Sequence, residues 1–192
     1  MIKIDILAVG NLVRAEDNTI LEAHSTSTLI RTDDRTIVVD TSSKYLRPAL
    51  KSSFRELGVF AKDVDTVILT HHHDDHTENL DLFPNAKVYI HEGYPGELPY
   101  KHETVTEDMD IAPGVRLVHT PGHTPDCMSV FVKADRNYAI AGDAIPLEGN
   151  VRQKVPPRTN YDPDLAMQSI KSIVRFADVI VPGHGFPFMT KM

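Results

Sequence analysis

The sequence predicts a single α/β domain over residues 1–192, and three observations support this class. The 192 residues fit one domain, and the chain is 41% apolar and 24% charged, as globular proteins are. Many short segments are rich in β-branched residues, and several have uninterrupted apolar cores such as Val67–Leu69 and Val179–Val181. Such runs predict strands buried on both faces, which requires sheets covered by helices or by another sheet.

Strands are expected along the whole chain. The first segment, MIKIDILAVG, alternates apolar and charged residues, which is typical of a strand. The expected strands, in chain order, are Ile2–Val9, Ser27–Arg31, Thr36–Asp40, Thr66–Thr70, Lys87–His91, Val115–His119, Ser129–Val132, Tyr138–Gly142 and Val179–Pro182.

Helices are expected in three places. Near residues 43–58 apolar side chains recur at helical spacing, and Gly58 is a suitable C-terminal stop. Near residues 162–177 Asp162 can cap the helix, Pro163 suits its first position, and later apolar residues form one face. A short third helix is expected to begin near Thr77. The proline-containing stretches 92–100 and 146–160 are expected to be loops.

Charge and cysteine content exclude several classes of protein. With 27 acidic and 20 basic residues the net charge is −7, which disfavours a long nucleic acid as the partner. The N-terminus has no signal-peptide core, and there is no uncharged apolar stretch of the roughly 20 residues that a membrane span needs. The lone cysteine, Cys127, has no disulfide partner. A cytoplasmic protein without membrane contact is therefore expected.

A cluster of metal-ligand residue types follows one buried strand. Residues 71–76 read His-His-His-Asp-Asp-His and contain the pattern His-x-His-x-Asp-His at His71, His73, Asp75 and His76. Because the strand Thr66–Thr70 directly precedes them, these side chains are expected at the carboxyl end of a sheet, where α/β proteins place their sites.

Three more residues of the same types follow other expected strands. His123, Asp143 and His184 come after the strands ending at 119, 142 and 182, and a glycine directly precedes each of them. A glycine lets the backbone turn sharply and approach a compact centre. Four strand ends are thus expected to bring five histidines and two aspartates to one edge of the fold.

This set of side chains predicts a pair of divalent metal ions. Imidazole and carboxylate without thiolate suit Zn²⁺, Fe or Mn²⁺, with Zn²⁺ the first expectation. Seven ligands are too many for one tetrahedral zinc but natural for two ions that share a carboxylate. Two such ions can hold a bridging hydroxide and clamp a substrate.

These motifs, taken together, resemble the metallo-β-lactamase-fold hydrolases. The likeness spans Val38–Asp40, Thr70–His76, Pro121–Pro125, Ala141–Asp143 and Pro182–Gly185. It implies a four-layer αβ/βα sandwich with the metals at one edge. The segment 76–84, which comes after the segment 65–70, also resembles the family named metallo-β-lactamase domain-containing protein 1. This second likeness is confined to that part of the chain.

The resemblance also implies a role for each site residue. One metal would be held by His71, His73 and His123, and the other by Asp75, His76 and His184. Asp143 would bridge the two. Asp40 matches the aspartate that orients a metal-bound histidine, and its alternative role is a strand-end cap.

Departures from the family pattern narrow the function. The family's glycine after Asp40 is absent, and Ser42 or Ser43 is expected to cap the next helix or, failing that, to face the pocket. Cys127 does not match the ligand cysteine of β-lactamases and is expected in the core. Only eight residues follow His184, so we expect no C-terminal substrate domain.

The histidines outside the pattern and one basic loop are weighed separately. His72 is expected to point away from the ligands. The others are expected to be structural or to lie at the surface, namely His24, His91, His102 and His119. The loop Arg152–Arg158 carries three cations that either steer an anionic substrate or offset acidic neighbours.

Three activities remain open from the sequence. The first is hydrolysis of a small ester, thioester or lactone by the metal-bridging hydroxide, with Asp75 as a catalytic proton carrier. The second is phosphodiester cleavage, as a phosphodiesterase or nuclease. The third is a mononuclear iron persulfide dioxygenase that uses His71, His123 and Asp143. The expected partner is a small-molecule substrate, and the oligomeric state is left open.

Overall fold

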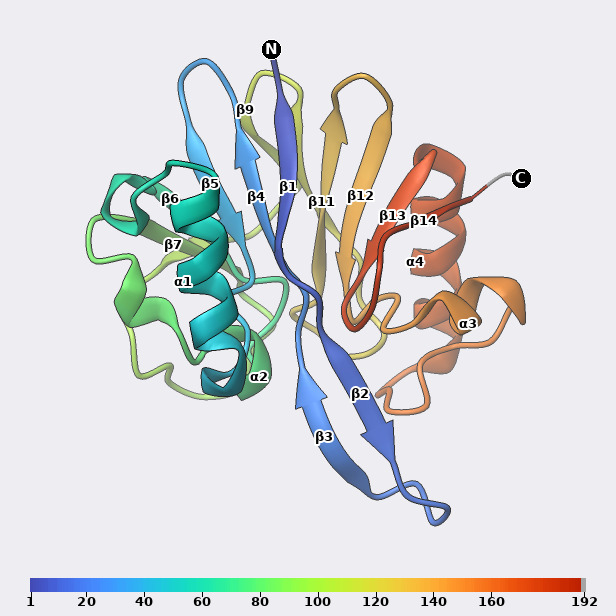
Figure 1. The fold of residues 1–192 in the computed structure, drawn as a ribbon. Coiled ribbons are helices and arrows are strands. Elements are labelled where there is room, and N and C mark those ends of the chain that lie inside the picture. The colour runs from blue at the N-terminus through green and yellow to red at the C-terminus, as the bar shows by residue number, and fades with distance from the viewer. Residues whose placement is uncertain (191–192) are drawn as a thin grey trace.

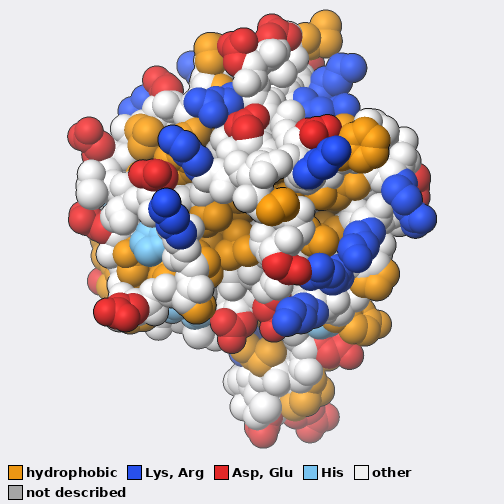
Figure 2. All heavy atoms as spheres, turned by 90° about the vertical axis from the view of Figure 1, so that its left-hand side faces the viewer, with side chains coloured by type: hydrophobic (Ala, Val, Ile, Leu, Met, Phe, Trp, Pro, Cys, Tyr) orange, Lys and Arg blue, Asp and Glu red, His pale blue; other side chains and the backbone are white. Residues whose placement is uncertain are grey.

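The computed structural model describes residues 1–190 and has four layers (Figure 1). Two six-stranded sheets face each other, and helices cover the outer face of each sheet. The predicted four-layer α/β sandwich is confirmed. A two-stranded hairpin, β2 (Asn11–Arg14) and β3 (Ile20–His24), projects from one end of the sandwich. In the space-filling view this hairpin carries hydrophobic side chains and an acidic tip (Figure 2).

The first sheet has the strand order β1-β4-β5-β6-β7-β8. Its strands from β5 to β8 run parallel, whereas β1 and β4 are antiparallel to their neighbours. Its strands are β1 (Lys3–Ala8), β4 (Ser27–Arg31), β5 (Thr36–Val39), β6 (Thr66–Ile68), β7 (Lys87–His91) and β8 (Glu103–Val105).

The second sheet has the order β14-β13-β12-β11-β10-β9 and is antiparallel except for the pair β12 and β13. Its strands are β9 (Met109–Ala112), β10 (Val115–His119), β11 (Met128–Lys133), β12 (Asn137–Gly142), β13 (Val179–Pro182) and β14 (Phe188–Met189). Because β12 and β13 are parallel, residues that follow them leave the sheet at the same edge.

Within residues 1–190, four helices accompany the sheets. The first sheet is covered by α1 (Arg47–Glu56), and the second by α4 (Pro163–Phe176). The shorter helices are α2 (Asp74–Thr77) and α3 (Glu148–Arg152), and single 3₁₀ turns span η1 (Lys44–Leu46), η2 (Ala61–Asp63) and η3 (Leu80–Leu82). Among the described residues, every helix is too short or too polar to cross a lipid bilayer.

The apolar core consists of three clusters, one between each pair of layers. The central cluster lies between the two sheets, and each outer cluster lies between a sheet and its helices. Every residue of β6 and of β13 is buried. This confirms the strands that their uninterrupted apolar runs predicted, because each such strand contacts one cluster with each face.

The long second helix was predicted closely. Asp162 caps α4, since its carboxylate accepts hydrogen bonds from the backbone N–H groups of Asp164 and Leu165 at 2.9 Å. Pro163 occupies the first helical position, as expected. Ala166, Ile170 and Ile173 are buried against the second sheet.

Three predictions about local structure were wrong. The short helix α2 lies within the histidine cluster rather than beginning near Thr77, because the turn after His73 is already helical. The expected loop 146–160 contains α3. Neither serine caps η1 through its side chain, because the Ser42 hydroxyl donates to the Ser25 carbonyl and the Ser43 hydroxyl bonds His24.

Candidate metal centre

The structure brings all seven predicted residues to one edge of the sandwich, in loops that follow β6, β10, β12 and β13. Imidazole and carboxylate atoms of three groups lie within 4.8 Å of one another inside each group. Two of these groups do not share a residue: one is His71, His73 and His123, and the other is Asp75, His76 and His184. Asp143 joins His71 and His76 in the third group.

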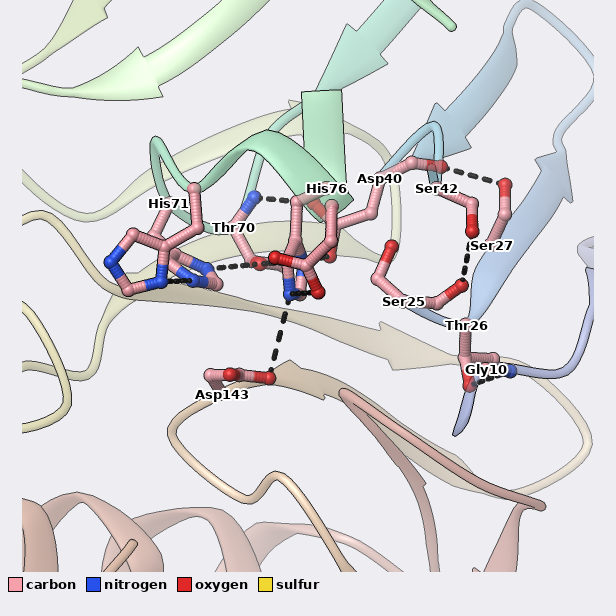
Figure 3. A network of polar contacts seen from close by, with 12 residues as sticks. Gly10, Ser25, Thr26, Ser27, Asp40, Ser42, Thr70, His71, His76 and Asp143 are labelled. Atoms are coloured by element: carbon pink, nitrogen blue, oxygen red, sulfur yellow. Dashed lines mark hydrogen bonds and ion pairs between the residues drawn. The ribbon is translucent and has the colours of Figure 1, made fainter. Parts of the chain in front are cut away.

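Asp143 lies between the two separate groups. One of its carboxylate oxygens is 3.5 Å from Nε2 of His76 and 3.2 Å from Nε2 of His184. The other is 3.5 Å from Nε2 of His123. Figure 3 shows this carboxylate facing His76, with a dashed line between the two side chains. One side chain can therefore reach both groups at once.

Unpaired buried atoms test whether the cluster fits a metal. Within residues 1–190, Oδ2 of Asp75, Nε2 of His76 and Oδ1 of Asp143 are buried and have no hydrogen-bond partner. A buried polar atom without a partner is costly, so each such atom needs an explanation. All three atoms face the same small space, and they are the oxygen and nitrogen types that divalent metals bind. The residues present therefore fit the binding of a divalent metal.

Asp40 supports the cluster from behind. It is 1% exposed, and its carboxylate accepts hydrogen bonds at 2.8 Å from the Thr70 backbone N–H, the Thr70 hydroxyl and Nδ1 of His76 (Figure 3). Because Nδ1 of His76 donates to Asp40, its Nε2 is left to face the centre as an electron-pair donor. Asp40 also holds the backbone at the end of β6, because it accepts the Thr70 N–H.

Two other histidines are oriented in the same way by backbone carbonyls. Nδ1 of His123 bonds the Thr159 carbonyl oxygen at 2.7 Å. Nδ1 of His184 bonds the His24 carbonyl oxygen at 2.9 Å. A histidine whose Nδ1 donates outward presents Nε2 to the centre, which is the usual arrangement of metal-binding histidines.

A chain of polar contacts connects this edge to the base of the hairpin (Figure 3). Ser27 is the first residue of β4, the strand that follows the hairpin, and its hydroxyl donates to the Asp40 carbonyl at 2.6 Å. The Thr26 hydroxyl accepts from Gly10 and donates to the Gly185 carbonyl. The Thr26 N–H also donates to the Gly183 carbonyl at 2.7 Å. The loop that carries His184 is therefore fixed to both ends of the hairpin.

The protonation of the cluster follows from burial and from its charges. Burial, reinforced by neighbouring histidines, holds the pKa of His71 well below its ordinary value and lowers the pKa of His73 to about 4. Burial alone would also lower the pKa of His76, but the Asp40 and Asp143 carboxylates raise it well above its ordinary value. His71 and His73 are thus neutral at pH 7, which is the form that binds a metal.

Two glycines are required by close approach around Asp143. Gly142 has φ of +51°, and a Cβ there would collide with the Thr70 side chain. A Cβ on Gly183 would occupy the position of the Asp143 carboxylate. The glycines before Asp143 and His184 therefore let the ends of β12 and β13 come together.

Residues expected outside the site lie outside it. His72 points away, since its backbone N–H and its Nδ1 both bond the buried Asp126 carboxylate at 2.9–3.0 Å. Cys127 is 1% exposed, which confirms the prediction of a core residue, and burial raises the pKa of its thiol. The side chains of the remaining histidines contact residues away from the cluster or form stacked pairs, namely His24, His91, His102 and His119.

A cavity of about 370 Å³ opens onto the cluster. Its floor includes His73, Asp75, His123, Asp143 and His184. One wall is the β2–β3 hairpin, and the opposite wall is the segment from 146 to 159 that contains α3.

Sequence reasoning missed the hairpin wall, although a signal was present. The polar residues Glu16, Asp17 and Asn18 lie between two short apolar segments, which is a pattern typical of a hairpin turn. The opposite wall was expected to be a loop. Of the three cations in the loop Arg152–Arg158, Arg158 lies near the site, because it lines the cavity. Arg152 instead pairs with Glu148 at 2.8 Å.

The four-layer sandwich and the imidazole–carboxylate cluster at its edge define a metal-dependent enzyme of the hydrolase class. Comparisons with known proteins agree. Residues 21–111 match the family model of the metallo-beta-lactamase superfamily. A probable metallo-hydrolase of Methanocaldococcus jannaschii is 37% identical over 95% of this chain and 87% of its own. The chain therefore belongs to the metallo-beta-lactamase superfamily.

Other similar proteins add detail. Metallo-beta-lactamase domain-containing protein 1 of Xenopus laevis is 32% identical over 88% of this chain and 74% of its own, which confirms the predicted likeness to that family. An N-acyl homoserine lactonase of Bacillus thuringiensis is 29% identical over 62% of this chain and 53% of its own. A crystal structure from Thermotoga maritima that is classed with the metallo-beta-lactamases has a TM-score of 0.81 at 23% identity, over 98% of this chain and 99% of that one.

Proposed function

We propose that the protein is a dinuclear hydrolase of small esters, thioesters or lactones. The observation that carries this proposal is the position of Asp143 between two separate groups of ligand atoms, with an oxygen within 3.5 Å of a histidine of each group. One metal would be held by His71, His73 and His123, and the other by Asp75, His76 and His184. Asp143 would serve both, and Zn²⁺ suits this donor set.

The bound metals would supply a water molecule of lowered pKa and would polarise the bond to be cleaved. Asp75 is placed to move a proton, because its side chain is 21% exposed at the floor of the cavity while the neighbouring histidines are almost fully buried. It can accept the proton of the attacking water and return it to the leaving oxygen. Asp40 and the two backbone carbonyls keep the histidine rings in place throughout.

The cavity supports a small substrate. A space of about 370 Å³ lies within the range of small-molecule sites. The similarity to the Bacillus thuringiensis lactonase favours an ester or lactone carbonyl as the bond attacked.

The test combines metal analysis with a substrate panel. We expect about two metal ions per chain and turnover of nitrophenyl esters, lactoylglutathione or acyl lactones by the metal-loaded protein. Turnover of bis-nitrophenyl phosphate alone would replace this proposal with a phosphodiesterase. One iron per chain with oxygen-dependent turnover of a persulfide would replace it with the mononuclear dioxygenase.

A further inference from the structure

The walls of the cavity carry two arginines and no acidic residue. Outside the cluster on the floor, the charged residues that line the cavity in residues 1–190 are Arg14, from the hairpin, and Arg158, from the opposite wall. This is unusual for a chain with a net charge of −7. Of the three cations in the loop Arg152–Arg158, only Arg158 lines the cavity, and the second cation there, Arg14, comes from the hairpin.

Neither arginine has a carboxylate partner within the described residues. Arg14 donates to the Asn18 carbonyl and to the Thr159 hydroxyl, both at 3.0 Å. Arg158 donates to the Asn18 side-chain oxygen. All three acceptors are neutral, so both positive charges remain uncompensated.

These neutral contacts also hold the two guanidinium groups in place. Arg14 reaches across from the hairpin to Thr159, and Arg158 reaches back to Asn18, so the two residues join the walls at the same point. A guanidinium that is already positioned loses little conformational freedom when it binds an anion. Each group uses only part of its set of five N–H donors, which leaves donors for a ligand.

The remaining wall surface is largely apolar. Leu12 and Ile20 belong to the hairpin, and Leu147 and Val155 belong to the opposite wall. Ile20, Leu147 and Val155 are 40–48% exposed, so they form a rim above the buried histidines. A ligand in the cavity therefore meets metal-ligand atoms at the floor, apolar side chains along the walls, and two cations where the walls meet.

We propose that the substrate is an ester or lactone whose acyl part ends in an oxyanion, and that Arg14 and Arg158 bind this oxyanion. The inference rests on the proposed function for the identity of the cleaved bond. The apolar walls contact the carbon chain between the two ends of the substrate. The two arginines thereby select acidic substrates over neutral ones of the same length.

Matched substrates test the proposal with the metal-loaded protein. The 4-nitrophenyl ester of hexanoate and the mono-4-nitrophenyl ester of adipate differ only in a terminal carboxylate. We expect kcat/KM to be at least about 10-fold higher for the adipate ester, because hydrogen bonds to charged groups are worth this much or more. In the double variant Arg14→Gln/Arg158→Gln this preference should fall to about 2-fold or less.

Two control variants separate charge from structure. Asn18→Gly removes the side-chain oxygen that Arg158 contacts but keeps both charges, and glycine accepts the positive φ of 69° found at this position. It should reduce the preference for the adipate ester without abolishing it, because both charges remain but the Asn18 side chain no longer holds Arg158 in place. Arg55→Gln removes a cation on α1, which does not line this cavity, and should leave both rates unchanged.

Calorimetry provides a measurement that does not depend on turnover. Adipate and 5-phosphonopentanoate, which have the same four methylene groups between their acidic ends, should each bind at least about 10-fold more tightly than hexanoate, and the double variant should lose this difference. The two anions show whether a carboxylate or a phosphonate is preferred. Equal kcat/KM for the two esters, or a preference that survives in the double variant, would overturn the inference while leaving the hydrolase intact. If no ester is hydrolysed, the proposed function fails, and the binding comparison alone decides the role of the arginines.

Discussion

The sheet from β1 to β8 supplies four of the seven site residues from the single segment 71–76, whereas the sheet from β9 to β14 supplies the other three from three separate loops. The supports differ as well. In the first half His76 is held by the buried Asp40 carboxylate. In the second half His123 and His184 are held by backbone carbonyls of Thr159 and His24, which belong to or adjoin the cavity walls.

The two halves of the candidate metal centre therefore differ in how far they depend on the shape of the cavity. A carboxylate inside the protein fixes the first half independently of the cavity. The second half is fixed by the same segments that contact a substrate, so the shape of the cavity and the position of two histidines are coupled. We therefore expect wall mutations to alter turnover modestly through His123 and His184, and mutations behind the first half to alter metal affinity.

The largest expected effect is the loss of the residue shared by both groups. Asp143→Ala should lower kcat/KM by about 1,000-fold or more, since a metal contributes several kcal/mol to the stabilisation of charge in the transition state. His71→Ala should have a similar effect. Circular dichroism should show both variants folded, because neither side chain belongs to an apolar cluster. Full activity in either variant would refute the dinuclear assignment.

Replacing the carboxylate behind the first half should have the next largest effect. Asp40→Asn should weaken metal binding by about 10- to 100-fold, because an amide no longer provides the charge that orients and polarises His76. Competition with a chromophoric chelator measures the affinity. Asp126→Asn is the matched control: it removes a buried carboxylate that bonds His72 in the same turn, on the side away from the metals. If Asp126→Asn weakens metal binding as much as Asp40→Asn, the loss does not come specifically from the bond between Asp40 and His76.

A wall mutation tests the second half. The Asn160 side chain donates to the Pro157 carbonyl at 2.6 Å and holds the loop whose Thr159 carbonyl orients His123. Asn160→Ala should lower kcat by about 2- to 10-fold, which is the cost of about one hydrogen bond. Asn85→Ala breaks the same kind of bond, to the Lys62 carbonyl, far from the cavity. Steady-state kinetics should show no change for Asn85→Ala, and an equal loss in both variants would contradict the coupling.

The same contrast explains what the sequence could predict. The segment 71–76 could be identified because its ligands are adjacent in the chain, and the buried strands β6 and β13 because their apolar runs are uninterrupted. Each of the three distant site residues was indicated by its position after an expected strand and by the glycine before it. These signals are local, so they survive without knowledge of the fold.

The parts that were missed depend on contacts between distant segments. The β2–β3 hairpin is mostly exposed, so it lacks the strong alternation by which half-buried strands are recognised. The partner of Arg14 is Thr159, which is 145 residues away along the chain. The serines after Asp40 were expected to cap a helix, but the carbonyl of Ser25 and the ring of His24 compete for them. No local pattern around Arg14 or around the two serines identifies these distant partners.

The smallest expected effect concerns the turn after His123. Cys127 is buried, and its sulfur lies 3.1 Å from the Thr124 hydroxyl, so the thiol closes the turn that begins with a site histidine. Cys127→Ala should lower the free energy of unfolding by about 1 kcal/mol and leave turnover unchanged, because the Cys127 N–H still donates to the Thr124 carbonyl. Burial raises the pKa of this thiol above its usual value, so the native protein should resist iodoacetamide. Rapid alkylation before unfolding, seen by mass spectrometry, would show that this turn opens, and His123 would then depend on the Thr159 carbonyl alone.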